Sequence, residues 1–221
     1  MHTGTDPHAE QRVLRRGPRP RDARIAIVLV HGRGADAESI LTPITEELQA
    51  GDILFVAPQA AGNTWYPYSF LEPMPRNQPG LSSGLRQIQR LIAGLGADGI
   101  PAERVGLMGF SQGACLALEF AARHATRYAG VAGLSGGLIG PAGTPRDYQG
   151  SLDDTPVFLG CSDVDAHIPL ARVHESATVF RHLGARVDER IYPGMGHTIN
   201  ADELEAVRGI MRAVLESGPE A

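Results

Sequence analysis

Apolar and polar positions follow two different periods along the chain. Six short apolar runs, rich in Val, Ile and Leu and bounded by turn residues, have the pattern of buried β-strands. They lie at 25–30, 53–57, 105–110, 129–134, 157–161 and 187–192. Segments with the 3.6-residue period of amphipathic helices separate them, at 37–50, 82–95, 112–124, 170–183 and 201–217. This alternation predicts an α/β fold, with a mainly parallel central sheet covered by helices on both faces.

The first 24 residues do not follow this alternation. They are polar, with five arginines among prolines between positions 15 and 24, and we expect either a flexible arm or a short edge strand at 11–15. No composition break or long linker interrupts the rest, so residues 25–221 are predicted to form a single domain. In a sheet of this kind, ligands bind at the carboxyl ends of the strands.

Composition and charge narrow the function classes. The chain has 221 residues, 43% of them hydrophobic, and 20 Lys and Arg against 25 Asp and Glu. These values argue against wholesale disorder and against nucleic-acid binding, which needs a basic face. Two cysteines cannot build a disulfide framework, and no apolar run is long enough for a signal peptide or a membrane span. We expect a cytoplasmic monomer or homodimer without stable membrane insertion, acting on a small molecule.

The pattern Gly-x-Ser-x-Gly occurs twice, around Ser111 and around Ser135. A nucleophilic serine on an α/β sheet sits at a sharp turn between a strand and a helix, so the residues two before and two after it must be small. Ser111 follows an apolar run and precedes a stretch of strong helix formers. Ser135 also ends an apolar run, but Gly136 and Gly137 follow, and no helix is expected there. Ser111 is therefore the candidate nucleophile.

A serine needs a general base, and the base needs an acidic group that orients it. On this architecture the order along the chain is Ser, Asp or Glu, then His. His197 fits, because it lies in a glycine-rich loop after the last predicted strand. Asp163 and Asp165 both follow the strand at 157–161, and their spacing alone does not choose between them. His167 beside them invites a metal site, but no second cluster of ligands accompanies it, so neither a metal nor a cofactor is expected.

Two further segments are candidates for substrate contacts. An oxyanion hole requires two backbone N–H groups, and Gln112 and the glycine-rich loop at 31–34 suit that requirement. The irregular segment 58–80 holds Trp65, Tyr66, Tyr68 and Phe70, which either form a pocket wall or pin the segment to the domain. The predicted substrate contacts are Gly32, Trp65, Tyr66 and Phe70.

Four motifs together resemble the phospholipase/carboxylesterase family of α/β-hydrolases, which includes the acyl-protein thioesterases. They are HGRGA at 31–35, GFSQGA at 109–114, DAHIP at 165–169 and GMGH at 194–197. The resemblance covers the chain from about residue 25 to its end and implies an α/β-hydrolase fold. It also implies a Ser111, Asp165 and His197 triad, with the amides of Arg33 and Gln112 as oxyanion donors.

The predicted function is that of a serine carboxylesterase that cleaves small to medium carboxylic esters through an acyl-enzyme. Arg33, where the thioesterase branch usually has an apolar residue, and the Trp-Tyr-Pro-Tyr stretch at 65–68 favour this activity over acyl-protein thioesterase activity. An acyl thioesterase or lysophospholipase, and a non-catalytic small-molecule binder on the same fold, are the alternatives. A further hypothesis is that Arg33 attracts an anionic group of the substrate.

Overall fold

The computed structural model describes residues 6–48 and 51–217 and contains one seven-stranded sheet. The strands are β1 (Val13–Arg16), β2 (Ile25–Val30), β3 (Ile53–Pro58), β4 (Val105–Phe110), β5 (Gly130–Leu134), β6 (Pro156–Ser162) and β7 (Arg186–Tyr192). Their order across the sheet is β1-β3-β2-β4-β5-β6-β7. Only β1 is antiparallel to its neighbour, and the six predicted strands pair in parallel. The predicted α/β fold with a mainly parallel sheet is confirmed.

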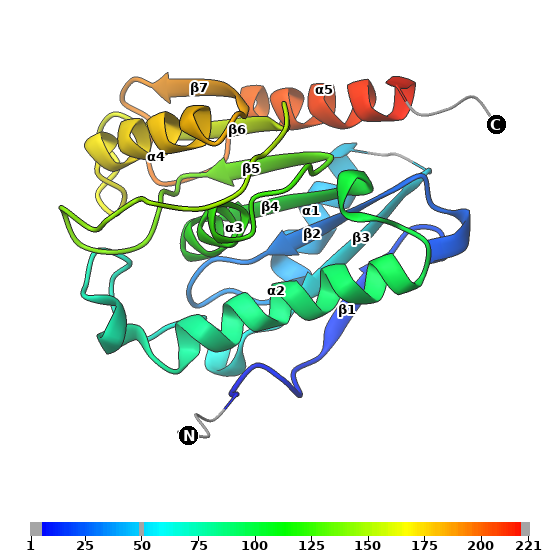
Figure 1. Cartoon of the computed structure of the whole chain (residues 1–221), viewed down its shortest axis with the longest axis horizontal. Helices are drawn as coiled ribbons and strands as arrows, with labels where there is room; N and C mark the ends of the chain where they lie inside the picture. Colours follow the sequence, from blue (N-terminus) through cyan, green and yellow to red (C-terminus); the bar gives the residue numbers. More distant parts are fainter. Residues whose placement is uncertain (1–5, 49–50, 218–221) are drawn as a thin grey trace.

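Five long helices cover both faces of this sheet (Figure 1). They are α1 (Ala37–Leu48), α2 (Gly80–Ala97), α3 (Gln112–Arg123), α4 (Leu170–His182) and α5 (Ala201–Ser217). Helices α2, α3 and α4 contribute to the apolar cluster on one face, and α1 and α5 contribute to the cluster on the other. The predicted helix at 37–50 is described as far as Leu48, and residues 49–50 lie outside the described part.

Strand β2 explains why both faces need helices. All six of its residues are buried, and alternate side chains enter opposite clusters. Ile25, Ile27 and Leu29 pack toward α1 and α5, whereas the intervening residues pack toward α2 and α3. Successive side chains of a strand point to opposite faces, so an uninterrupted apolar run requires cover on both sides.

The N-terminal segment packs against the domain from Asp6 onward. Strand β1 pairs with β3 at the edge of the sheet and overlaps residues 11–15, where a short edge strand was one of two expectations. Before it, His8 is almost fully buried, its backbone N–H donates to the Ser83 hydroxyl of α2, and its ring meets Trp65 edge-on. Residues 1–5 lie outside the described part.

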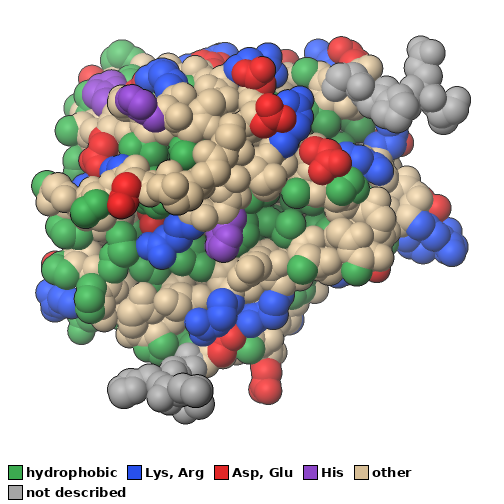
Figure 2. Space-filling model, viewed as in Figure 1, with side chains coloured by type: hydrophobic (Ala, Val, Ile, Leu, Met, Phe, Trp, Pro, Cys, Tyr) green, Lys and Arg blue, Asp and Glu red, His purple; other side chains and the backbone are tan. Residues whose placement is uncertain are grey.

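The surface and the helices add two findings. On the face shown in Figure 2, acidic and basic side chains lie in small mixed groups and do not gather into one charged patch. Within the residues that the structure describes, no helix is both long enough and apolar enough to cross a membrane.

Candidate active site

Ser111 occupies the sharp turn between β4 and α3. Its backbone has φ 55° and ψ −121°, a conformation that side-chain-bearing residues rarely adopt and that stores strain at functional sites. Two glycines allow the turn. A Cβ at Gly109 would overlap the carbonyl group of Gly113, and a Cβ at Gly113 would overlap the carbonyl oxygen of Val30 in β2. The turn therefore presents the Ser111 hydroxyl at the carboxyl end of the central strand.

Three side chains form a hydrogen-bonded chain across neighbouring strand ends. Ser111 Oγ lies 2.8 Å from His197 Nε2, and His197 Nδ1 lies 2.7 Å from Asp165 Oδ2. His197 is carried by the loop after β7, and Asp165 by the loop after β6. With the imidazole proton on Nδ1, the histidine donates to the carboxylate and accepts from the serine hydroxyl. This is the geometry that activates a serine hydroxyl.

The carboxylate of Asp165 is held in its charged form by hydrogen bonds. Burial alone would raise the pKa of Asp165, but the hydrogen bonds from His197 and from the amides of His167 and Ile168 outweigh it and lower that pKa. The Cys161 thiol also donates to Asp165 Oδ2, at 3.7 Å. An ionised and fixed carboxylate keeps the imidazole in one orientation.

The neighbouring Asp163 has a different position. Its Oδ1 accepts a hydrogen bond of 2.8 Å from the backbone N–H of Gly194, at the start of the loop that carries His197. Of the two aspartates that spacing left open, Asp165 is hydrogen-bonded to His197 and Asp163 to the backbone of the same loop.

Two backbone N–H groups lie beside Ser111. Gln112 is the first residue of α3, and no residue of the described part accepts a hydrogen bond from its amide or from that of Arg33. The loop that carries the Arg33 amide packs closely against Ser111, because a Cβ at Gly32 would lie 3.4 Å from Ser111 Cβ. The positive end of the α3 dipole adds to the field at this point. The position suits the binding of a developing oxyanion.

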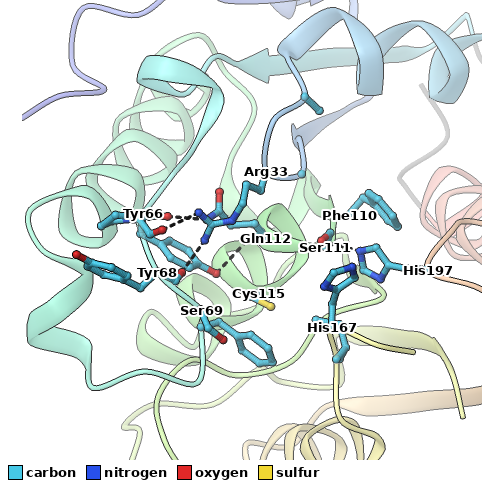
Figure 3. Close-up of a pocket in the computed structure, with 15 residues that line it drawn as sticks. Arg33, Tyr66, Tyr68, Ser69, Phe110, Ser111, Gln112, Cys115, His167 and His197 are labelled. Atoms are coloured by element: carbon cyan, nitrogen blue, oxygen red, sulfur yellow. Dashed lines mark hydrogen bonds between the residues drawn. The ribbon is translucent and has the colours of Figure 1, made fainter. Parts of the chain in front are cut away.

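A cavity of about 490 Å³ opens beside Ser111 (Figure 3). This volume lies in the range of ordinary small-ligand sites. The residues expected from sequence that line it are Gly32, Arg33, Tyr66, Phe70, Ser111, Gln112 and His197. Segment 66–70 therefore forms one wall of the cavity, as one interpretation of its aromatic residues required.

Trp65 corrects the expected set of substrate contacts. Its side chain is fully buried and does not line the cavity. The indole Nε1–H donates to the His31 carbonyl oxygen at 2.9 Å, and the rings of His8 and His31 both lie 5.1 Å from Trp65. Trp65 therefore pins segment 58–80 to the domain, which was the other interpretation of these aromatic residues.

Gln112 holds the same segment through its side chain. Its Oε1 accepts from the Trp65 backbone N–H at 2.8 Å, and its Nε2 donates to the Tyr66 carbonyl oxygen at 2.8 Å. Arg33 adds a second attachment, since its guanidinium donates to the carbonyl oxygens of Pro67 and Tyr68 at 2.8 and 2.6 Å. The side chains of Gln112 and Arg33 thus fix the wall of the cavity.

Cys115 and His167 are among the lining residues of the cavity that sequence reasoning did not predict as substrate contacts. Cys115 lies in the first turn of α3, close along the chain to Ser111, and that proximity could have indicated it. His167 lies 4.8 Å from His197, ring centroid to ring centroid, and no local pattern predicts that contact. Within the described residues, no group of three or more His, Cys, Asp and Glu side chains is arranged to hold a metal ion.

Ser135 of the second Gly-x-Ser-x-Gly pattern lies elsewhere in the fold. It follows the last residue of β5 with φ 51°, and it is fully buried. Irregular chain follows it as far as β6, so no helix begins directly after it. A buried hydroxyl without substrate access cannot act as a nucleophile.

Comparisons with known proteins place this chain in a family. The model of the phospholipase/carboxylesterase family matches residues 18–215. A phospholipase/carboxylesterase of Dyadobacter fermentans DSM 18053 is 39% identical, with a TM-score of 0.87 over 97% of this chain and 99% of that chain. Acyl-protein thioesterase 1 of Saccharomyces cerevisiae is 27% identical over 92% of this chain and 99% of that protein.

Acyl-protein thioesterase 1 of Gibberella zeae is 34% identical over 121 residues, and the match spans about half of that relative, 51%. The family match, by contrast, extends over nearly all of the described residues, from before β2 to the last turns of α5. The seven-stranded, mostly parallel sheet is also shared with solved α/β-hydrolases. This chain is a hydrolase of the phospholipase/carboxylesterase family, with the α/β-hydrolase fold.

Proposed function

We propose that this protein is a serine carboxylesterase that hydrolyses small to medium carboxylic esters through an acyl-enzyme. The observation that carries the proposal is the hydrogen-bonded chain from Asp165 through His197 to Ser111. This chain ends at a strained turn beside a cavity, and it needs no metal or cofactor for ester hydrolysis.

Acylation begins when the ester carbonyl enters the cavity beside Ser111. His197 Nε2 takes the hydroxyl proton while Oγ attacks the carbonyl carbon, and Asp165 stabilises the imidazolium that forms. The amides of Arg33 and Gln112 donate to the oxyanion of the tetrahedral intermediate. When the intermediate collapses, the bond from carbon to the alcohol oxygen breaks, and His197 returns its proton to the departing alcohol.

Deacylation repeats these steps with water. His197 Nε2 takes a proton from a water molecule, whose oxygen attacks the acyl carbon of the Ser111 ester. The same two amides bind the second oxyanion. Collapse releases the carboxylic acid and returns the proton to Ser111 Oγ, so the enzyme is regenerated.

The cavity walls support a preference for small to medium esters. Tyr66 and Cys115 line the cavity and are each only 1% exposed, so this part of the lining is buried in the domain. Phe70 and Ile168 add further apolar surface that is nearly buried. A cavity of about 490 Å³ with this lining accommodates a limited acyl chain and disfavours longer ones, which would leave methylene groups in water.

The test is a rate profile over p-nitrophenyl esters from acetate to palmitate. We expect the highest kcat/KM at short or medium chain length and a loss of several orders of magnitude in kcat in Ser111→Ala, because triad members act as a unit. Ser135→Ala is the matched control, since it removes the serine of the same motif without touching the cavity. Retention of more than about a tenth of the activity in Ser111→Ala would exclude Ser111 as nucleophile.

Thioester hydrolysis is the second candidate function. The names of relatives such as acyl-protein thioesterase 1 of Saccharomyces cerevisiae support it, and it uses the same catalytic groups. Turnover of acyl-CoA or of acylated protein is measured against the oxyester of equal chain length. A higher kcat/KM for the thioester would favour this function over the carboxylesterase.

A non-catalytic small-molecule binder is the alternative from a different class. A fluorophosphonate probe reports on it directly, because the probe reacts only with an activated serine. We expect labelling at Ser111 that is lost in His197→Ala. Absence of labelling in the unmodified protein would favour the binder.

A further inference from the structure

The cavity beside Ser111 carries one permanent charge. Its 15 lining residues, all within the described part of the chain, include Arg33 and no Asp or Glu. The remaining titratable groups of the lining are histidine, tyrosine and cysteine side chains. The chain as a whole has a formal net charge of −5, so this cation-bearing cavity differs in sign from the protein around it.

The charge of Arg33 is not neutralised by a carboxylate. Its guanidinium donates to two backbone carbonyl oxygens and lies 5.9 Å from the centre of the Tyr66 ring. Among the described residues, no carboxylate lies within 4.0 Å of the Arg33 guanidinium, the distance that an ion pair requires. Arg76, on the same irregular segment, differs, because its guanidinium pairs with Glu72 at 2.8 Å.

The acidic groups near the cavity face other partners. The carboxylate of Asp36, three residues after Arg33, accepts from the Ser39 backbone N–H at 2.8 Å. Asp165 is fully buried behind His197 and accepts from it. An anion that enters the cavity therefore meets an unpaired guanidinium at its wall and no competing carboxylate in its lining.

The Arg33 guanidinium also has N–H groups that its two carbonyl partners do not use. Arg33 carries five N–H bonds, and the two carbonyl oxygens accept two of them. Carbonyl partners orient the group without cancelling its charge, so it is held in place for a further acceptor. In Figure 3, Arg33 extends toward Tyr66 and Tyr68, while His167 and His197 lie beside Ser111.

Two buried titratable side chains of the cavity lining are uncharged. Burial raises the pKa of the Cys115 thiol to about 12, so the group is neutral at physiological pH. Burial also raises the pKa of Tyr66 well above its usual value. The cavity thus combines neutral, buried side chains with one cationic group, Arg33.

We propose that the cavity selects esters that carry a second, anionic group, of the carboxylate class, which pairs with the Arg33 guanidinium while Ser111 attacks the ester carbonyl. This inference rests on the proposed esterase function and narrows its substrate class. Selectivity follows because a neutral ester of the same shape leaves the guanidinium without its counter-ion.

The test compares kcat/KM for matched pairs of esters by pH-stat titration. One pair carries the charge on the acyl side, monoethyl adipate against ethyl heptanoate. The other carries it on the alcohol side, 4-acetoxybutanoate against pentyl acetate. The quantity of interest is the ratio of the anionic to the neutral ester within each pair, since a general loss of activity cancels in that ratio.

Three variants separate the charge of Arg33 from its attachment to the wall. Arg33→Gln removes the charge, and we expect the ratio to fall about fivefold for at least one pair, the effect of a partly exposed ion pair. Arg33→Lys keeps a charge but loses the two-pronged hydrogen bonding, and it should retain most of the ratio. Arg76→Gln is the matched control and should leave the ratio unchanged, because Arg76 does not line the cavity. Added salt should lower the ratio in the unmodified protein and not in Arg33→Gln.

The outcomes distinguish this inference from the proposed function. Turnover of the neutral esters that is lost in Ser111→Ala, with ratios that stay the same in Arg33→Gln for both pairs, would overturn the inference and leave the esterase standing. If neither ester of either pair is hydrolysed in a Ser111-dependent manner, the proposed function falls and the inference falls with it.

Discussion

Glu203 is a fully buried carboxyl group in the first turn of α5, three residues after the end of the loop that carries His197. Its Oε2 accepts from the Asn200 backbone N–H at 2.9 Å, and its own N–H donates to Asn200 Oδ1 at 2.9 Å, a reciprocal cap of the helix. Its Oε1 has no hydrogen-bond partner among the described residues and lies against Gly160 of β6. The carboxylate is thus stabilised on one oxygen only.

This burial predicts a pH-dependent contribution to stability. Burial, with a smaller effect from the charge of Asp202, raises the pKa of Glu203 from 4.5 to about 7, although the Asn200 N–H opposes the shift. The folded state therefore keeps this proton at pH values where the unfolded chain has released it. Stability falls as pH rises from about 4.5 to about 7, by roughly 1.4 kcal/mol per pH unit at most and about 3 kcal/mol in total.

The perturbation that isolates this contribution is Glu203→Gln, which has no titrating carboxyl group. We expect the free energy of unfolding of the unmodified protein to decrease by about 2.5 kcal/mol, relative to the variant, between pH 5 and pH 8. Urea denaturation at four pH values across this interval measures it. Glu205→Gln, on the same helix with its side chain exposed, is the control for the loss of a carboxylate from α5. A difference between Glu203→Gln and the unmodified protein that is constant from pH 5 to pH 8 would refute the reasoning.

Four further predictions follow from the site. Asp165→Asn should lower kcat for p-nitrophenyl butyrate by roughly three to four orders of magnitude, whereas Asp163→Asn, which keeps an acceptor for its backbone partner, should stay within about threefold; the reverse ranking would exchange their roles. Gly113→Ala should destabilise the fold by about 2 kcal/mol or more and abolish turnover, because its Cβ overlaps β2, and an unchanged melting temperature would contradict this. Trp65→Phe should cost about 1 kcal/mol in urea denaturation through the lost indole hydrogen bond while the chain-length profile stays unchanged; a shifted profile would return Trp65 to the substrate contacts. Cys115→Leu should move the optimum of that profile to shorter esters, and a profile that does not move would show that Cys115 does not limit the cavity.

The secondary structure was accessible from the sequence because it depends on local periodicity. The six predicted strands and five predicted helices agree with the observed ones to within two residues at each end that the structure describes. The distinction between Ser111 and Ser135 was also local. Helix formers follow Ser111 and glycines follow Ser135, and the structure accordingly has a helix after Ser111 and irregular chain after Ser135.

Candidate site residues were predictable where a motif constrains the backbone. Gly109 is required by the turn itself, since its Cβ would overlap the Gly113 carbonyl group, whereas Gly113 is required by the close approach of β2. The order of serine, acid and histidine along the chain follows from the order of strand ends in a parallel sheet. The resemblance to a known family then favoured Asp165 over Asp163.

The tertiary structure alone decided which side chains of the irregular segments face the cavity. Trp65 and Tyr66 are adjacent aromatic residues in the same irregular segment, yet the Trp65 side chain is directed into the domain and the Tyr66 side chain lines the cavity. The partners of Arg33 lie 34 and 35 residues away, and Ser111 and His197 are separated by 86 residues. Such contacts depend on how loops from different strand ends pack together, and neither periodicity nor turn chemistry encodes the direction of a side chain in a loop. The sequence by itself thus determined the architecture and the strained serine, whereas the shape and charge of the cavity came from packing between distant segments.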